Sequence, residues 1–175
     1  MLTLLRHQKE EERLDKSLVI LKKLFKMKKF KGAWTILFYA SAHGEVDTFE
    51  MIKRAQKLGK KIGLPRIIRG RSSIVPTLVS NLDKDLKKGP YGIKQPKESR
   101  GKTLNLKKID MVIVPGLAFD RCHYRLGRGA GYYDRFLKKL PSHIPTIGLA
   151  FDFQIIKTLP QKAAHDVPVS QVVFN

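Results

Sequence analysis

The segment RLGRGAGYYDRFL, residues 125–137, places three glycines among arginines, tyrosines and an aspartate. Glycines adopt positive φ at little cost and let a ligand approach the backbone closely. Successive N–H groups in such a turn can form an anion-binding concavity, and a helix that follows adds its free N-terminal N–H groups. Arg125 and Arg128 bring full charges with bidentate geometry for phosphate. The segment therefore predicts a phosphate-binding loop followed by a helix that extends to about Leu140.

The glycine spacing alone does not identify the ligand. A P-loop needs Gly-Lys-Ser/Thr, which the segment lacks, and the third glycine comes one residue too early for the dinucleotide-binding pattern. A tight basic turn with a purely structural role stays open as the alternative. Asp134 has two interpretations as well: it either complements the helix dipole or holds Mg²⁺ against the phosphates with its carboxylate oxygens.

The elements before this loop indicate where it lies. The apolar run at 110–119 predicts a buried strand, ended by Pro115-Gly116 at its carboxyl end. Since ligands of open α/β sheets bind beyond the carboxyl ends of the strands, the loop is expected at such a site. Further strands are predicted at 144–151 and 167–174, from short apolar runs next to prolines.

The first half of the chain predicts a strand–helix–strand unit. The helical spacing of Leu14, Leu18, Leu21 and Phe25 indicates an amphipathic helix whose apolar face, formed by these residues, packs inward. The apolar run 33–40 predicts a buried strand.

A second helix is expected to start at a capping box formed by Asp47 and Glu50 and to stop at Gly59. The strand KIGLP after it is expected to end at Pro65. This alternation predicts an α/β fold with a largely parallel central sheet flanked by helices, in one domain over residues 1–175.

Composition limits the classes of partner and compartment. Lys and Arg number 35 against 15 Asp and Glu, a net charge of +20 that favours polyanions such as nucleotides, nucleic acids or polyglutamate. The single cysteine, Cys122, excludes a disulfide within the chain and favours the cytoplasm. No apolar stretch is long enough to cross a membrane. Cys122-His123 does not predict a thiol nucleophile, because no third orienting residue is evident.

A long, ordered set of motifs resembles one family. VPGLAFDRCHYRLGRGAGYYDRFL is similar to the signature of the 5-formyltetrahydrofolate cyclo-ligase (5,10-methenyltetrahydrofolate synthetase) family. Four more segments resemble parts of the same family and occur in the same order: EVDT, GKKIGLP, YGIKQP and FQIIKTLPQKAAHDVPV. The resemblance implies a fold like that of ribose-5-phosphate isomerase and CoA transferases. It also implies ATP- and Mg²⁺-dependent closure of 5-formyltetrahydrofolate to 5,10-methenyltetrahydrofolate, with release of ADP and phosphate.

The resemblance also implies roles for individual residues. Arg128 is the residue expected to reach the transferring phosphoryl group. The residues implied in ATP binding are Arg6, Arg125, Leu126, Gly127, Arg128, Gly129, Ala130, Gly131, Tyr132 and Tyr133. Those implied in folate binding are Ala40, Glu45, Tyr91 and Tyr132, and those implied in Mg²⁺ binding are Asp134 and Asp166. The expected partners are ATP and a reduced folate, which includes polyglutamylated forms; no nucleic acid or membrane is expected, and the protein is expected to be a monomer.

The chain departs from the family pattern at several positions. Arg6 matches the arginine of an N-terminal Lys and Arg pair that precedes the position of Ser17, but the lysine has no counterpart, so a shortened N-terminal helix is expected. Gln95 stands where the family usually has Glu, and His123 where it has Gly. The chain ends in VVFN, where the family usually reads Thr-Glu.

The alternative functions that stay open are a divergent relative without cyclo-ligase activity, a basic nucleic-acid-binding protein, and a phosphosugar isomerase or CoA transferase of similar fold.

Overall fold

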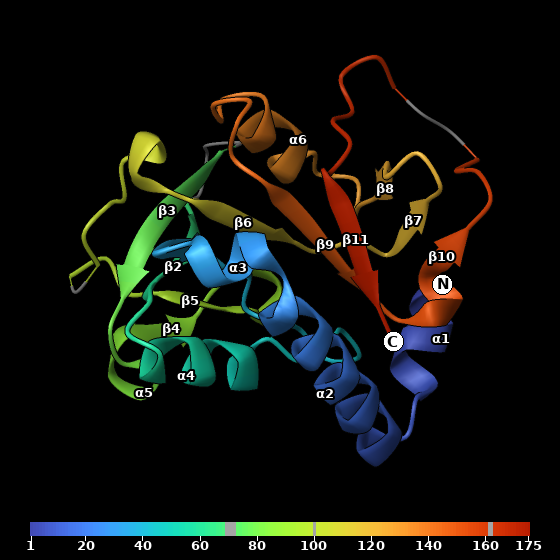
Figure 1. Cartoon of the computed structure of the whole chain (residues 1–175), viewed down its shortest axis with the longest axis horizontal. Coiled ribbons are helices and arrows are strands. Elements are labelled where there is room, and N and C mark those ends of the chain that lie inside the picture. Colours follow the sequence, from blue (N-terminus) through green and yellow to red (C-terminus); the bar gives the residue numbers. More distant parts are fainter. Residues whose placement is uncertain (69–72, 100, 161–162) are drawn as a thin grey trace.

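The computed structural model describes residues 1–68, 73–99, 101–160 and 163–175. Its centre is a six-stranded sheet with the strand order β11-β9-β6-β1-β2-β3 (Figure 1). The strands are β1 (Thr35–Leu37), β2 (Lys61–Ile67), β3 (Ile74–Val79), β6 (Met111–Val114), β9 (Thr146–Ala150) and β11 (Gln171–Phe174). Neighbouring strands run parallel except β2 and β3, which are antiparallel. The α/β fold with a largely parallel central sheet is thus confirmed.

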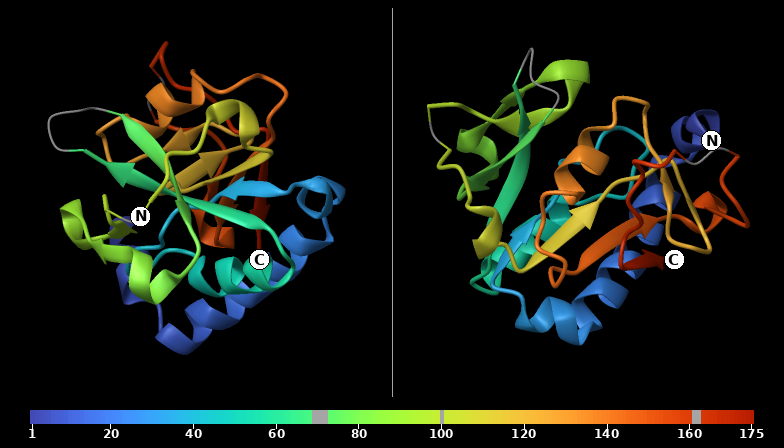
Figure 2. Two further views of the ribbon diagram at one scale, coloured as in Figure 1. Left: turned by 90° about the vertical axis from the view of Figure 1, so that its left-hand side faces the viewer. Right: turned by 90° about the horizontal axis from the view of Figure 1, so that it is seen from above.

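Helices cover both faces of the sheet (Figures 1 and 2). They are α1 (Leu2–His7), α2 (Glu10–Lys26), α3 (Lys28–Gly32), α4 (Phe49–Lys57), α5 (Leu82–Asp85) and α6 (Tyr132–Leu137). Along β1, Ile36 belongs to the core shared with α2 and α4, and Leu37 to the core shared with α6. This alternation follows from the two-residue period of a strand. In the part of the chain described, none of the helices has the length and hydrophobicity to span a bilayer.

Two smaller sheets branch from the central one. Strands β7 (Ala118–Asp120), β8 (Arg125–Leu126) and β10 (Ile155–Ile156) form one, in the order β10-β7-β8. Strands β4 (Leu86–Lys88) and β5 (Lys94–Pro96) form an antiparallel hairpin. The 3-10 turns are η1 (Pro90–Gly92), η2 (Leu106–Lys108) and η3 (Asp152–Gln154).

Helix α2 confirms the predicted first helix, and the inward face predicted from the leucine spacing is right in part, since Leu21 is buried and Phe25 packs against the core. Ser17 and Ile20 are buried, whereas Leu14 is 39% exposed. The Ser17 hydroxyl accepts the N–H of Asp47 at 3.0 Å, which joins α2 to the loop before α4. A hydroxyl can be buried when it is hydrogen-bonded, so a serine on this stripe faces inward in place of a leucine.

The predicted capping box at Asp47 and Glu50 is also wrong. Helix α4 begins at Phe49, whose N–H donates to the Asp47 carboxylate at 3.0 Å, while Glu50 forms an ion pair with Arg54 at 2.7 Å. A short aspartate side chain readily bonds the N–H two residues on, which explains why it does not reach further. The predicted stop is confirmed, because Gly59 follows the helix with a φ of 78°.

Pro65 acts differently from the prediction, whereas Pro115 ends its strand as predicted. β2 continues through Pro65, because β2 pairs with β1 only as far as Gly63 and a missing N–H beyond that point breaks no bond to β1. The strand predicted within 110–119 ends at Pro115 as expected: β6 ends at Val114, and the apolar residues after Gly116 form β7, which joins a smaller sheet. This break opens the space in which the candidate site lies.

Candidate functional site

A cavity, which we call the main cavity, opens beyond the carboxyl ends of β1 and β6, where the sequence predicts the ligand site. Tyr39 and Ala40 line it just after β1, and Pro115 and Gly116 line it just after β6. The loop that precedes α6 and the hairpin strand β5 line it as well. Segments that are far apart in the sequence therefore meet at one cavity.

The glycine–arginine loop (residues 125–131) contains two left-handed residues before α6. Gly129 has a φ of 89° and Gly131 a φ of 62°, which glycine adopts without a steric cost. The loop residues that line the main cavity are Arg125, Gly127, Arg128, Ala130 and Gly131. Of the other predicted ATP contacts in this described loop, Leu126 and Gly129 do not line it. The loop backbone thus borders the main cavity, as a phosphate-binding role requires.

Arg125 anchors the loop from inside. Its side chain is 3% exposed, and its guanidinium donates to the Asp134 carboxylate at 2.8 Å and to the Val167 carbonyl at 2.7 Å. Burial lowers the pKa of Arg125, whereas the Asp134 carboxylate raises this pKa. The group stays protonated, since arginine does not lose its proton in proteins. These bonds tie the loop to α6 and to the C-terminal segment, and the phosphate contact of Arg125 stays a prediction.

Glu45 and Arg128, which the resemblance places in the folate and ATP halves of the site, are in direct contact. Glu45 Oε1 lies 2.9 Å from Arg128 Nη2. The other Glu45 oxygen accepts the N–H of Ala42 at 2.9 Å, and Arg13 donates to the Glu45 carbonyl at 2.7 Å. The Glu45 side chain is 12% exposed and that of Arg128 is 46% exposed. The carboxylate is therefore fixed against the backbone, and the guanidinium reaches it from the solvent side.

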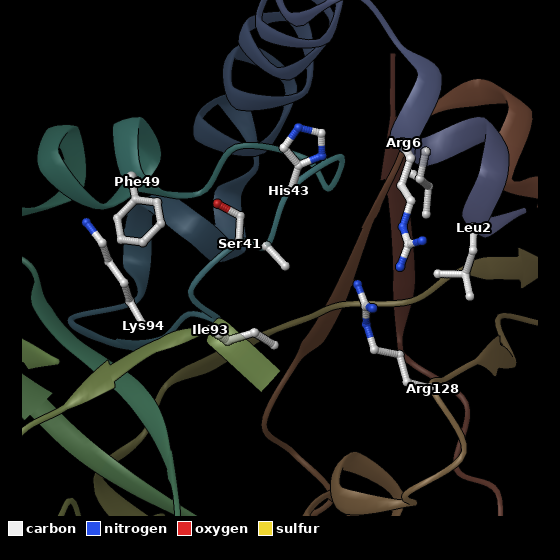
Figure 3. A pocket seen from close by; sticks show the side chains of 11 residues that line it. Leu2, Arg6, Ser41, His43, Phe49, Ile93, Lys94 and Arg128 are labelled. Carbon is white, nitrogen blue, oxygen red and sulfur yellow. The ribbon is translucent and has the colours of Figure 1, made fainter. Parts of the chain in front are cut away.

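A second cavity, which we call the side cavity, shares Ile93, Lys94 and Arg128 with the main cavity. Figure 3 shows the guanidinium groups of Arg6 and Arg128 pointing toward one another in it. No acidic residue is among the described residues that line the side cavity, while Lys94 adds a further cation. Glu45 lies outside this lining but pairs with Arg128, so Arg6 and Lys94 supply the further positive charge that attracts anions here.

The docking of α1 places Arg6 at the side cavity. Gly44 has a φ of 84°, and a Cβ atom at this position would collide with the Leu5 carbonyl oxygen. Gln8 joins the same two segments by donating to the Gly44 carbonyl at 3.2 Å. Helix α1 thus packs directly on the backbone of the loop that carries Glu45, and this packing brings Arg6 near the glycine–arginine loop.

Aromatic residues form part of the main cavity wall. Tyr132 and Tyr133 both line it, as does Ala40. Burial raises the pKa of Tyr133, and the nearby Glu45 raises this pKa further, so the hydroxyl stays a neutral hydrogen-bond donor. Tyr91 lies in η1, but its side chain is outside the described part of the structure, and its folate contact stays a prediction.

The two predicted metal ligands are held near the same segment. Asp134 Oδ1 accepts the N–H of Val167 at 3.3 Å, and Asp166 Oδ2 accepts the N–H of Ala163 at 2.8 Å. Each carboxylate has a second oxygen outside these two bonds. The described residues contain no group of three or more His, Cys, Asp and Glu side chains that could hold a metal by themselves. Two carboxylates fit Mg²⁺, which is usually bound by one or two of them together with phosphate oxygens.

His123 occupies a turn position that favours glycine. Its φ is 65°, and Asp120 closes the turn by accepting the N–H groups of Cys122 at 2.9 Å and Tyr124 at 3.0 Å. A left-handed conformation costs a residue with a Cβ roughly 1–2 kcal/mol, which explains the glycine that the family usually has here. His123 lines neither of the two cavities.

The sequence analysis missed two residues at the site. Arg13 holds the Glu45 backbone, and Lys94 lines both cavities with its ammonium 5.5 Å from the centre of the Phe49 ring. Arg13 gave a weak signal, since it lies four residues before the buried Ser17 on the same helix face. Lys94 gave none, because the short polar strand β5 has no apolar alternation that would identify it.

Comparisons with known proteins agree with this geometry. The model of the 5-formyltetrahydrofolate cyclo-ligase family matches residues 1–175. The chain is 34% identical to the 5-formyltetrahydrofolate cyclo-ligase of Mus musculus, over 98% of this chain and 88% of that protein. It is 32% identical to the probable 5-formyltetrahydrofolate cyclo-ligase of Caenorhabditis elegans, over 100% of this chain and 89% of that protein.

Solved structures lead to the same family. The NMR structure of Aquifex aeolicus 5,10-methenyltetrahydrofolate synthetase superimposes with a TM-score of 0.84 and 34% identity, over 98% of this chain and 84% of that one. A 5,10-methenyltetrahydrofolate synthetase from Mycoplasma pneumoniae, at 22% identity and a TM-score of 0.77, shares the fold. With a family match over its whole length and relatives above 30% identity, the chain belongs to the 5-formyltetrahydrofolate cyclo-ligase family.

Proposed function

We propose that this protein uses ATP to close 5-formyltetrahydrofolate to 5,10-methenyltetrahydrofolate, with release of ADP and phosphate. The observation that carries the proposal is the contact between Glu45 and Arg128 at 2.9 Å. It joins the residue implied in folate binding to the residue implied in phosphoryl transfer. A folate bound by Glu45 and a γ-phosphate held by Arg128 would therefore share one site, as direct phosphoryl transfer to the formyl group requires.

The reaction requires that the protein position the two substrates and stabilise negative charge; it does not require a protein nucleophile. The formyl oxygen attacks the γ-phosphorus, and the bond from that phosphorus to ADP breaks. N10 of the folate then attacks the activated formyl carbon and loses its proton, and phosphate departs in place of a poor oxide leaving group. Negative charge gathers on the transferring phosphoryl oxygens, where fixed cations and N–H groups stabilise it.

The residues divide between the two substrates. In this proposal Arg128 and Arg6 contact the phosphate chain from two sides, and the N–H groups of the glycine–arginine loop bind the same phosphates. The Glu45 carboxylate accepts N–H groups of the pterin, a charge-assisted arrangement. Ala40 and Tyr132 border the pterin in the main cavity.

The carboxylates of Asp134 and Asp166 would hold Mg²⁺ together with the phosphates. The ion, when bound, neutralises charge on the phosphate oxygens. The hydrogen bonds to Val167 and Ala163 keep each carboxylate oriented while leaving one oxygen for this role.

The direct test follows the absorbance of the methenyl product with 5-formyltetrahydrofolate, ATP and Mg²⁺. We expect product formation that requires ATP and is matched by an equal amount of released phosphate. If well-folded protein forms no product with ATP present, the chain is a relative without cyclo-ligase activity. Nucleic-acid binding in that case would support the alternative that the net charge of +20 leaves open.

Substitution of Glu45 tests the folate half. Glu45→Ala is expected to raise the KM for 5-formyltetrahydrofolate by about 10- to 100-fold, since hydrogen bonds to a charged group contribute roughly 1.5–3 kcal/mol. The KM for ATP should change less. Glu50→Ala, which removes a carboxylate from the outer face of α4, is the matched control. An unchanged folate KM in Glu45→Ala would remove Glu45 from the pterin site.

A further inference from the structure

The carboxylate of Glu45 is fixed within its own turn. Its Oε2 accepts the N–H of Ala42 at 2.9 Å, and the Glu45 N–H donates to the Ala42 carbonyl at 3.1 Å. These two hydrogen bonds join the same two residues, so they hold the side chain against the backbone of the turn. Where the carboxylate points then depends on where the whole turn lies, and bonds from outside the turn determine that position.

Arg13 of α2 bonds the backbone of this turn. Its Nη1 donates to the Glu45 carbonyl at 2.7 Å, a short hydrogen bond with a charged donor. Its Nε and Nη2 donate to the two carboxylate oxygens of Glu10, at 2.9 Å and 2.6 Å. Because all three nitrogens of the planar guanidinium are bonded, the group is held in one orientation against Glu45.

Arg13 is more enclosed than the arginine of a similar ion pair in this chain. Its side chain is 12% exposed, against 48% for Arg54, which pairs with Glu50 on α4. The hydrogen bond from Glu10 raises the pKa of Arg13, so the guanidinium keeps its charge. A charged group that leaves water is normally paired and hydrogen-bonded. Here Glu10 supplies the opposite charge, and the Glu45 carbonyl supplies a further acceptor.

Helix α2 holds the same segment at a second point, one turn further along. The Ser17 hydroxyl donates to the Arg13 carbonyl at 2.7 Å and accepts the N–H of Asp47 at 3.0 Å. Residues four apart lie on one face of a helix, so Arg13 and Ser17 meet the segment 45–47 together. Neither is among the described residues that line the main or the side cavity. This face of α2 therefore supports the residue implied in folate binding without lining the cavities.

We propose that Arg13 is a positioning residue, which sets the place of the Glu45 carboxylate and thereby the affinity for 5-formyltetrahydrofolate. This inference rests on the proposed function, in which Glu45 binds the pterin. Arg13 bonds the Glu45 backbone, so it acts on the folate through Glu45. Without Arg13 the carboxylate is still present, but the turn that carries it loses one of its bonds to α2.

The test measures the Kd for 5-formyltetrahydrofolate by calorimetry without ATP, and kcat with ATP and Mg²⁺. We expect Arg13→Met to raise this Kd by about 3- to 10-fold, the net effect of one hydrogen bond, and to leave kcat at saturation nearly unchanged. Arg13→Lys keeps a charged donor and should recover part of the affinity. Arg54→Met removes an arginine that pairs within α4 in the same way, so it is the matched control and should change neither quantity.

A double-mutant cycle separates positioning from a general loosening of the structure. If Arg13 acts through Glu45, Arg13→Met should have no further effect on the Kd once Glu45 has been replaced by alanine. A general loss of packing would instead weaken binding by the same factor in both backgrounds. Urea unfolding shows whether each variant retains its fold. Should Arg13→Met fail to fold, the same cycle is measured with Arg13→Lys.

The proposed function and the role of Arg13 fail on different results. A wild type that binds 5-formyltetrahydrofolate but forms no product overturns the proposed function, while the Kd comparison still decides the role of Arg13. That role is wrong if both Arg13 variants bind the folate as tightly as the wild type. It is also wrong if Arg13→Met weakens binding equally with and without the Glu45 side chain. A wild type that binds no folate at all would overturn both.

Discussion

Arg128→Ala is expected to lower kcat by about 10³-fold or more, because an arginine that stabilises a transferring phosphoryl group contributes roughly 10³–10⁵. Its side chain is 46% exposed and its ion-pair partner is Glu45. Ion pairs of this kind contribute about 0–1 kcal/mol, so the free energy of unfolding should change by less than that. Initial rates at saturating ATP and folate measure the first effect, and urea unfolding measures the second.

Two further variants make the result specific. Arg128→Lys keeps the charge but loses the planar fork that binds two phosphate oxygens, so its kcat should lie between those of the wild type and Arg128→Ala. Arg54→Ala removes a positive charge from the surface of α4 and should leave the rate unchanged. If Arg128→Ala kept the wild-type kcat, Arg6 would become the candidate for the same role, since the two guanidinium groups face one another (Figure 3).

The local elements around this site could be predicted because their signals are local. The apolar run that contains β1, the helical spacing of α4 and the stop at Gly59 each depend on residues within one turn or strand. The errors had local causes as well. Leu14 was assigned to the inward face although it is 39% exposed, and Pro65 was taken as a strand end although no ladder bond to β1 is required there.

The contacts between segments could not be predicted from spacing. Glu45 and Arg128 are 83 positions apart, and each lies in a loop. Helical and strand periods relate a residue to its near neighbours, and they carry no information on which loops meet. The resemblance assigned the two residues to separate substrates, but their contact required the order of β1 and β6 in the sheet and the break after β6.

The sequence also could not predict which arginine of the glycine–arginine loop is buried. Arg125 and Arg128 are two arginines of one loop, and the motif treats them alike. The fold encloses Arg125 between Asp134 and Val167, while Arg128 stays half exposed at the cavity. The difference depends on the C-terminal segment, whose path is set by β11 at the edge of the sheet.

Because Asp134 is the ion-pair partner of the buried Arg125, it has a structural role in addition to its predicted role in Mg²⁺ binding. Asp134→Ala is expected to lower the free energy of unfolding by about 3 kcal/mol or more, since removal of one partner leaves a buried charge uncompensated. The side chain of Arg125 is 3% exposed, and it would keep only the neutral Val167 carbonyl from its present bonds. Urea unfolding followed by far-ultraviolet circular dichroism measures the loss. Asp83→Ala, on exposed α5, is the matched control and should change little.

The two roles of Asp134 can be separated by removing its partner as well. The double variant Arg125→Met, Asp134→Ala should be more stable than Asp134→Ala alone, because no unpaired charge is then buried. If Asp134 also holds Mg²⁺, the double variant should need more Mg²⁺ for half-maximal rate than Arg125→Met alone, although its stability has recovered. Asp166→Ala should show the same higher Mg²⁺ requirement with the Arg125–Asp134 pair intact. Equal Mg²⁺ requirements in the double variant and Arg125→Met would leave Asp134 only as the partner of Arg125.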